Sequence, residues 1–105
     1  MTRVFKILTR QQLAEAQSAG SFNGSPDDLR DGFIHLSTAE QVAGTLQKHF
    51  AGRNDMLLAE IDIAPLFDSI KWELSRNNQL FPHLYAPLPL TAISDVREVS
   101  VSDLQ

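Results

Sequence analysis

Two histidine-containing segments hold the polar side chains that could do chemistry in this chain. His35 lies between Ile34 and Leu36, and Ser37 follows two residues later. In an extended strand, His35 and Ser37 would share one face, about 6.6 Å apart. They could then hold a ribose hydroxyl or a carboxamide, and His35 could act as a base near neutral pH. Alternatively, His35 bonds a backbone carbonyl in the core and Ser37 caps a helix.

The second segment, residues 79–90, carries His83 and Tyr85 among three prolines. Proline has no backbone N–H and a fixed φ, so this segment cannot form a long helix. An extended backbone would place His83 and Tyr85 on one side and Leu84 on the other. Both polar side chains are therefore candidates for ligand binding. The alternative is a rigid loop that packs its apolar side chains onto the core.

Two carboxylates are further candidates. Glu73 follows Trp72, and a carboxylate beside an indole can have a raised pKa, as a general acid requires. The alternative is an ion pair between Glu73 and Arg76. Asp62 ends an apolar segment, where it could contact a ligand or, more simply, cap a turn.

A cation site is the less favoured interpretation of the acidic segment. Asp27, Asp28 and Asp31 lie in residues 20–32, which contain three glycines and a proline and are predicted to form a loop. The aspartates lack the spacing of a calcium loop, which favours a solvated turn. No two histidines have the local spacing of metal ligands, so no metal is expected. His49 is expected to favour the dipole at the end of its helix.

The elements that must position these side chains follow from periodicity and turn signals. Residues 4–8 predict a strand with Lys6 on the opposite side from Phe5 and Ile7. Thr9 and Gln12 have the spacing of a capping box, which predicts a helix that ends at Gly20. A second helix, capped by Ser37 or Thr38, is predicted to end at Gly52. Strands are predicted at 33–37, 56–63, 70–74 and 92–101.

Two helices among several short strands, without a βαβ rhythm, indicate an α+β fold in a single domain, residues 1–105. The net charge is −4 and the pI is about 5.2, which argues against binding to a nucleic acid duplex. The chain has no cysteine, which excludes disulfides and thiol chemistry. No apolar run approaches the roughly 18 residues that span a membrane, so we expect a cytoplasmic protein. We also expect a monomer or weak dimer.

Four segments in the same order resemble a known bacterial family. They are DGFIHLST, LLAEID, the pair Trp72–Glu73, and FPHLYAPLPL. By these segments the chain is identified as a member of the family named domain of unknown function 952. This family resembles the ADP-ribosyltransferase fold, a small α+β split sheet whose cleft holds NAD in the enzymes.

The resemblance implies roles for particular residues. Leu36–Ser37–Thr38 resembles the strand-to-helix junction of the transferases, and Glu73 is the best counterpart of their ribose-orienting glutamate, ahead of Glu60. Relatives often have Tyr-His near Phe5–Lys6, so Lys6 is a departure, as is the lack of a Glu-x-Glu motif.

Three functional hypotheses follow. The first is a cleft that binds or processes an NAD-like or phosphorylated ribose compound, with Glu73 and His35 as catalytic residues. Its ligand-binding residues would be His35, Ser37, Thr38, His83 and Tyr85. The second is a non-catalytic binding module for a protein, a peptide or a small molecule. The third, metal-assisted hydrolysis by His35, His83 and an aspartate, is the least favoured. Whether the protein is an enzyme stays open at this point.

Overall fold

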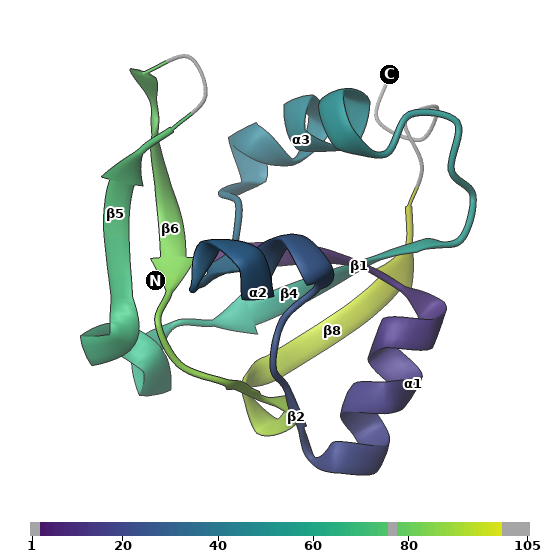
Figure 1. Ribbon diagram of the computed structural model, residues 1–105, viewed down its shortest axis with the longest axis horizontal. Coiled ribbons are helices and arrows are strands. Elements are labelled where there is room, and N and C mark those ends of the chain that lie inside the picture. The colour runs from purple at the N-terminus through teal and green to yellow at the C-terminus, as the bar shows by residue number, and fades with distance from the viewer. Residues whose placement is uncertain (1–2, 76–77, 100–105) are drawn as a thin grey trace.

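The computed structural model describes residues 3–75 and 78–99, and within them the chain forms an α+β fold with three small antiparallel sheets (Figure 1). The strands are β1 (Arg3–Thr9), β2 (Ser21–Phe22), β3 (Ile34–His35), β4 (Met56–Asp62), β5 (Ile70–Leu74), β6 (Leu80–Leu84), β7 (Leu88–Pro89) and β8 (Ile93–Glu98). The helices are α1 (Arg10–Ala19), α2 (Pro26–Asp31) and α3 (Val42–His49), with 3₁₀ turns η1 (Ala39–Gln41), η2 (Ala64–Ser69) and η4 (Leu90–Ala92). Within these ranges, no helix is long and apolar enough to cross a membrane.

The central sheet has the order β1-β4-β8 and separates two apolar clusters. Alternate residues of β4 enter different clusters: Leu57, Ala59 and Ile61 pack into one, and Met56 and Leu58 into the other. The strand predicted over residues 56–63 is therefore confirmed as β4, and apolar clusters cover both of its faces. Helix α1 packs on the first cluster, and α3 supplies residues to the second.

Helix α1 forms where its capping signals predict it. The Thr9 hydroxyl accepts a hydrogen bond from the Gln12 amide, and the Gln12 side chain accepts one from the Thr9 amide. These bonds satisfy donors that the first helical turn leaves free. The helix ends at Gly20, whose φ of 88° is the left-handed conformation that glycine adopts without strain.

The prediction of a loop over residues 20–32 is wrong. This segment contains strand β2 and helix α2, which begins with a second capping box formed by Ser25 and Asp28. Pro26 at the first helical position and Gly32 just past the last one complete the usual helix signals. Glycine, proline and aspartate are typical of loops, but here they are the start and end signals of a helix of six residues.

The second predicted helix is shorter and begins differently. The chain enters it through η1, where the Gln41 side chain accepts a hydrogen bond from the Thr38 amide. Helix α3 ends at His49, so the predicted end at Gly52 is wrong. Gly52 instead adopts a φ of 81° in the turn that follows.

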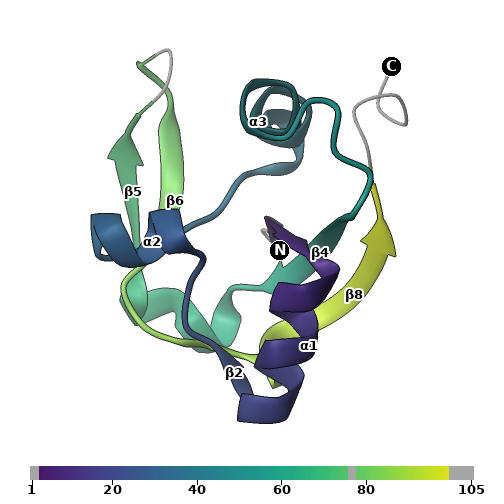
Figure 2. The ribbon, with the colours of Figure 1, turned by 45° about the vertical axis from the view of Figure 1, so that its right-hand side comes forward.

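A second three-stranded sheet, of order β3-β6-β5, stands beside the central one. The two sheets meet at Phe5 and Ser37, whose backbones exchange two hydrogen bonds of 2.8 and 2.9 Å. Figures 1 and 2 show the β5–β6 hairpin at one side of the molecule and β8 at the other. The last predicted strand forms as β8, while its final positions, 100 and 101, lie outside the described residues.

Candidate functional site

One face of the β3-β6-β5 sheet carries most of the polar side chains that the sequence singles out. The strand register places His35 of β3 directly opposite His83 of β6, and Lys71 of β5 opposite His83 on its other side. Directly opposed residues share a face, and so do residues two apart on one strand. Glu73 on β5 and Tyr85, just after β6, therefore lie on the face that carries the two histidines.

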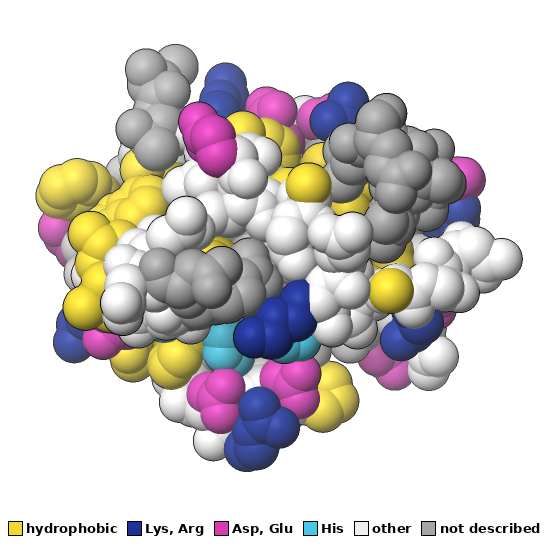
Figure 3. Space-filling view, turned by 90° about the horizontal axis from the view of Figure 1, so that it is seen from above, with side chains coloured by type: hydrophobic (Ala, Val, Ile, Leu, Met, Phe, Trp, Pro, Cys, Tyr) yellow, Lys and Arg dark blue, Asp and Glu magenta, His cyan; other side chains and the backbone are white. Residues whose placement is uncertain are grey.

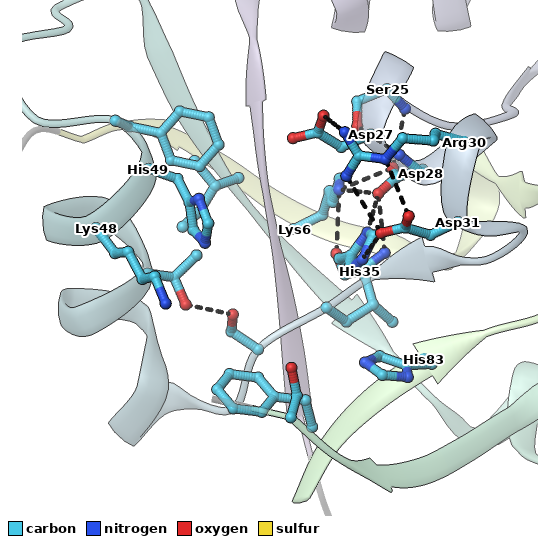
Figure 4. Close-up of a pocket in the computed structure, with 17 residues that line it drawn as sticks. Lys6, Ser25, Asp27, Asp28, Arg30, Asp31, His35, Lys48, His49 and His83 are labelled. Atoms are coloured by element: carbon cyan, nitrogen blue, oxygen red, sulfur yellow. Dashed lines mark hydrogen bonds and ion pairs between the residues drawn. The ribbon is translucent and has the colours of Figure 1, made fainter. Parts of the chain in front are cut away.

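A pocket of about 320 Å³ opens beside this face. All three histidines of the chain, His35, His49 and His83, line it. Figure 4 shows the acidic residues of α2 around His35 on one side, and Lys48 and His49 of α3 on the other. The surface view shows histidine side chains flanked by basic and acidic ones (Figure 3). Cationic side chains pair with the aspartates on the α2 side, so this wall carries charges of both signs, while α3 adds positive charge at Lys48.

His35 is held by two carboxylates of helix α2. Its Nδ1 lies 2.6 Å from Asp28 Oδ1, and its Nε2 lies 3.0 Å from Asp31 Oδ2. The backbone amide of His35 also donates to Asp28 Oδ1, at 3.1 Å. A carboxylate accepts hydrogen bonds, so both ring nitrogens are placed to act as donors. This geometry makes His35 a fixed element of the pocket wall.

Asp28 is bonded on all sides although it is almost fully buried. Lys6 Nζ lies 2.9 Å from Asp28 Oδ2 and donates to the carbonyl of His35 at 3.1 Å, while the Ser25 amide donates to Asp28 Oδ2 at 2.9 Å. Burial by itself would raise the pKa of the Asp28 carboxyl. The hydrogen bond from His35, the charge of Lys6 and the Ser25 amide outweigh burial and hold that pKa well below its ordinary value.

Lys6 is the cation that balances this carboxylate. Burial lowers the pKa of the Lys6 amine, and the nearby Asp28 charge opposes that shift. The predicted opposition of Lys6 to Phe5 and Ile7 holds, because Phe5 and Ile7 pack into the second apolar cluster. Lys6 extends into the other side of the sheet, where it meets α2 and lies 5.7 Å from the centre of the Phe22 ring.

Glu73 belongs to a second hydrogen-bonded group. Its Oε1 lies 2.8 Å from His83 Nδ1 and accepts a hydrogen bond of 2.6 Å from the Tyr85 hydroxyl. These two bonds lower the pKa of the Glu73 carboxyl, and Tyr85 is the larger cause. The expectation of a raised pKa from Trp72 is therefore wrong. Consecutive residues of a strand point to opposite faces, so the indole is on the other side of β5. The alternative partner, Arg76, lies outside the described residues.

The structure brings some of the predicted site residues together and leaves others apart. His35, Ser37 and His83 line the pocket, and the Ser37 hydroxyl lies 3.2 Å from that of Thr45 on α3. Glu73 and Tyr85 lie outside the pocket lining and connect to it through His83. Thr38 is also outside the lining. Asp62 accepts a hydrogen bond from the Ala64 amide, as a turn cap does.

Sequence reasoning missed several residues of the pocket. Asp28 was expected in a solvated turn and Lys6 counted only as a departure, yet they form the buried ion pair behind His35. The available signals were the Ser25–Asp28 capping spacing and a lysine in the middle of an apolar strand. Lys48 and Thr45 gave no signal, because a polar residue on a helix is ordinarily a solvated one. Across the described segments, no group of three potential ligands is arranged to hold a metal ion.

Comparisons with known proteins identify relatives of the chain but no activity. Residues 7–96 match the family described as "Protein of unknown function (DUF952)". The crystal structure of protein CC0527 from Caulobacter crescentus is similar at 41% identity and a TM-score of 0.89, over 92% of this chain and 85% of that one. The solution NMR structure of CC0527 is similar at 41% identity and a TM-score of 0.84, over 95% and 86%. No curated protein matches the sequence.

Proposed function

The chain belongs to the DUF952 family of proteins of unknown function, and we propose that its pocket binds a phosphorylated ribose compound, with NAD-like nucleotides as larger members of this class. The observation that carries the proposal is the pocket in which His35, Ser37 and His83 meet Lys48 and His49 of α3. The proposed ligand contacts come from segments that lie far apart in the sequence.

The two walls of the pocket suit different parts of such a ligand. Lys48 is a suitable donor for a phosphate, because cationic donors form the stronger hydrogen bonds with anions, and His49 lines the same side of the pocket. The hydroxyls of Ser37 and Thr45 suit the hydroxyls of a sugar, whereas Asp27 and Asp31 are already ion-paired with Arg30. A volume of about 320 Å³ is at the lower end of the range for small-molecule sites. It suits a phosphorylated sugar better than a complete dinucleotide.

The ADP-ribosyltransferase-like interpretation is part of this proposal. Two sheets joined at a single bridge, and the run Leu36–Ser37–Thr38 before η1, support a split-sheet fold of that kind. Transferase chemistry would also need a carboxylate at the ribose. The catalytic pair proposed from the sequence is His35 and Glu73. Both nitrogens of His35 face carboxylates, and Glu73 lies behind His83, so we propose ligand binding as the main activity.

A non-catalytic binding module is the second candidate, and exposed apolar side chains favour its protein-binding form. Trp72, Leu74 and Leu80 are exposed on the β5–β6 hairpin, and Leu74 is paired directly with Leu80. Such side chains on a surface suit a protein partner. Release of nicotinamide from NAD by the purified protein, lost in His35→Ala, would contradict a non-catalytic role.

Calorimetric titration tests the proposed ligand class. We expect heat of binding with ribose 5-phosphate, and the same measurement with ADP-ribose and NAD ranks larger ligands. Lys48→Ala should weaken binding about tenfold, because it removes a charged hydrogen bond. Arg97→Ala is the matched control, since it removes one positive charge from exposed β8, away from the pocket. A folded wild-type protein that binds none of these compounds would contradict the proposal.

A further inference from the structure

The ring of His83 is fixed by groups on three sides. Glu73 Oε1 lies 2.8 Å from Nδ1, and the Tyr85 hydroxyl holds the same oxygen at 2.6 Å. Phe33 stacks on the imidazole, with ring centres 4.0 Å apart and planes 23° apart. His35 approaches it edge-on, at 5.7 Å between centres. The hydrogen bond at Nδ1 and the stacked Phe33 ring therefore fix the orientation of the His83 imidazole.

The partner of Nδ1 decides where the ring proton lies. An ionised carboxylate has no hydrogen to donate, so the bond to Glu73 requires the proton on His83 Nδ1. The Tyr85 hydroxyl and the His83 ring both stabilise the ionised form of Glu73, consistent with its lowered pKa. In a neutral imidazole, Nε2 is then left with a lone pair. His83 also lines the pocket, and 7% of its side chain is exposed.

We propose that His83 is the hydrogen-bond acceptor of the pocket and reads a hydroxyl of the bound ribose, with Glu73 and Tyr85 as positioning residues. This inference rests on the proposed function for its ligand. It deepens that function by assigning a residue that selects for the sugar. His35 is not available for this role, because both of its ring nitrogens lie against carboxylates. An acceptor in the same pocket as the hydroxyls of Ser37 and Thr45 favours a ligand that donates hydrogen bonds.

The tautomer of His83 can be measured without any ligand. We expect side-chain nitrogen NMR at about pH 8, above the ordinary titration range of imidazole, to show the proton of His83 on Nδ1. In Glu73→Ala the proton should redistribute between the two nitrogens, while Glu15→Ala, an exposed change on α1, should leave the spectrum unchanged. Glu73→Leu serves the same purpose if the alanine variant does not fold, because leucine has no acceptor for the Nδ1 proton. A proton on Nε2, a doubly protonated ring, or no effect of either Glu73 variant would overturn the assignment.

Sugar selectivity tests the second half of the inference. We compare ribose 5-phosphate with its 2-deoxy and 3-deoxy analogues. The analogue that lacks the hydroxyl donating to His83 should bind about tenfold more weakly than ribose 5-phosphate. This preference should shrink in Glu73→Ala and persist in Glu15→Ala. Equal binding of all three sugars by the wild-type protein would overturn the role of His83 as a hydroxyl acceptor. Binding of none of them overturns the proposed ligand class, and the tautomer measurement still decides the proton position.

Discussion

Asp28 is the residue on which the α2 side of the pocket depends. It joins three elements, because its carboxylate bonds Lys6 of β1, His35 of β3 and the amide of Ser25 before α2. Burying two charges costs desolvation energy, and that cost is recovered only where hydrogen bonds are complete. Among the described residues, no buried polar side-chain atom is left without a partner. The buried ion pair of Lys6 and Asp28 is therefore tolerated in the fold, whereas either charge alone would be destabilising.

We expect Asp28→Asn to lower the free energy of unfolding by about 3 kcal/mol at neutral pH, because Lys6 is then a buried charge without a counterion. The folded pKa of the Asp28 carboxyl lies below the unfolded value, so its stabilising effect is complete above about pH 4 and is lost as the pH falls toward the folded pKa. The difference in the free energy of unfolding between wild type and variant should therefore be smaller at about pH 3 than at neutral pH.

Urea denaturation of both proteins at the two pH values measures this difference. Asp68→Asn is the matched control, since Asp68 is exposed on η2 and should change stability by less than about 0.5 kcal/mol. A loss that stays the same at both pH values would mean that the ionisation of Asp28 does not stabilise the fold.

Single residues of the site were predictable only where a short-range pattern places them. The period of two along a strand put His35 with Ser37, and His83 with Tyr85, and the β3–β6 register then brought the two histidines together. Lys6 and Asp28 are 22 positions apart, and no local pattern indicates that a lysine and a remote aspartate will share a buried site. The pKa of Glu73 was mispredicted for the same reason, since its true partners come from the neighbouring strand and the residue after it.

At the level of elements, Gly24 sets the position of α2. Its φ of 125° is outside the range of other residues, and an added Cβ would lie 2.9 Å from Asp28 Cβ. The turn at Gly24 therefore brings the capping box of Ser25 and Asp28 against His35. A side chain at this position would displace the carboxylate that holds the histidine.

Comparison of two glycine variants separates backbone strain from this displacement. Gly20→Ala should cost about 1 to 2 kcal/mol of stability, because its φ is 88° but nothing lies within 4 Å of the new Cβ. Gly24→Ala should cost more, about 3 kcal/mol, and should also shift the NMR signals of the His35 ring. Thermal or urea unfolding gives the stabilities. Equal costs with unchanged His35 signals would contradict the role assigned to Gly24.

A helix or strand was predictable from the sequence where its capping residues flank a segment with a clear apolar period or a run of helix formers. Thr9, Gln12 and Gly20 flank a run of helix formers, so α1 was found from the sequence. Ser25, Pro26 and Gly32 are equally good signals, but α2 is too short for an apolar period to mark it. The end of α3 was misplaced at Gly52 because that glycine serves the following turn.

At the scale of the whole molecule, the pocket lies across the joint between the two main sheets. Lys6 comes from β1 of the central sheet, His83 from β6 of the second, and Ser37 from the bridge between them. The two Phe5–Ser37 bonds cross the joint, and a bond of 3.1 Å from the Leu36 amide to the Pro82 carbonyl extends the β3–β6 pairing up to it. Central strands are paired along their length, and such regions open less readily than short junctions.

Hydrogen exchange should therefore show the joint opening before the central sheet does. We expect the Ser37 amide to exchange faster than that of Leu58, because β4 is paired with β1 on one side and β8 on the other. Saturating ribose 5-phosphate should slow exchange at Ser37 more than at Gly20, whose amide bonds the Ala16 carbonyl far from the pocket. A ligand that spans the two sheets stabilises their closed arrangement selectively. Equal slowing at both amides would show that the ligand stabilises the fold as a whole, without a specific effect on the joint.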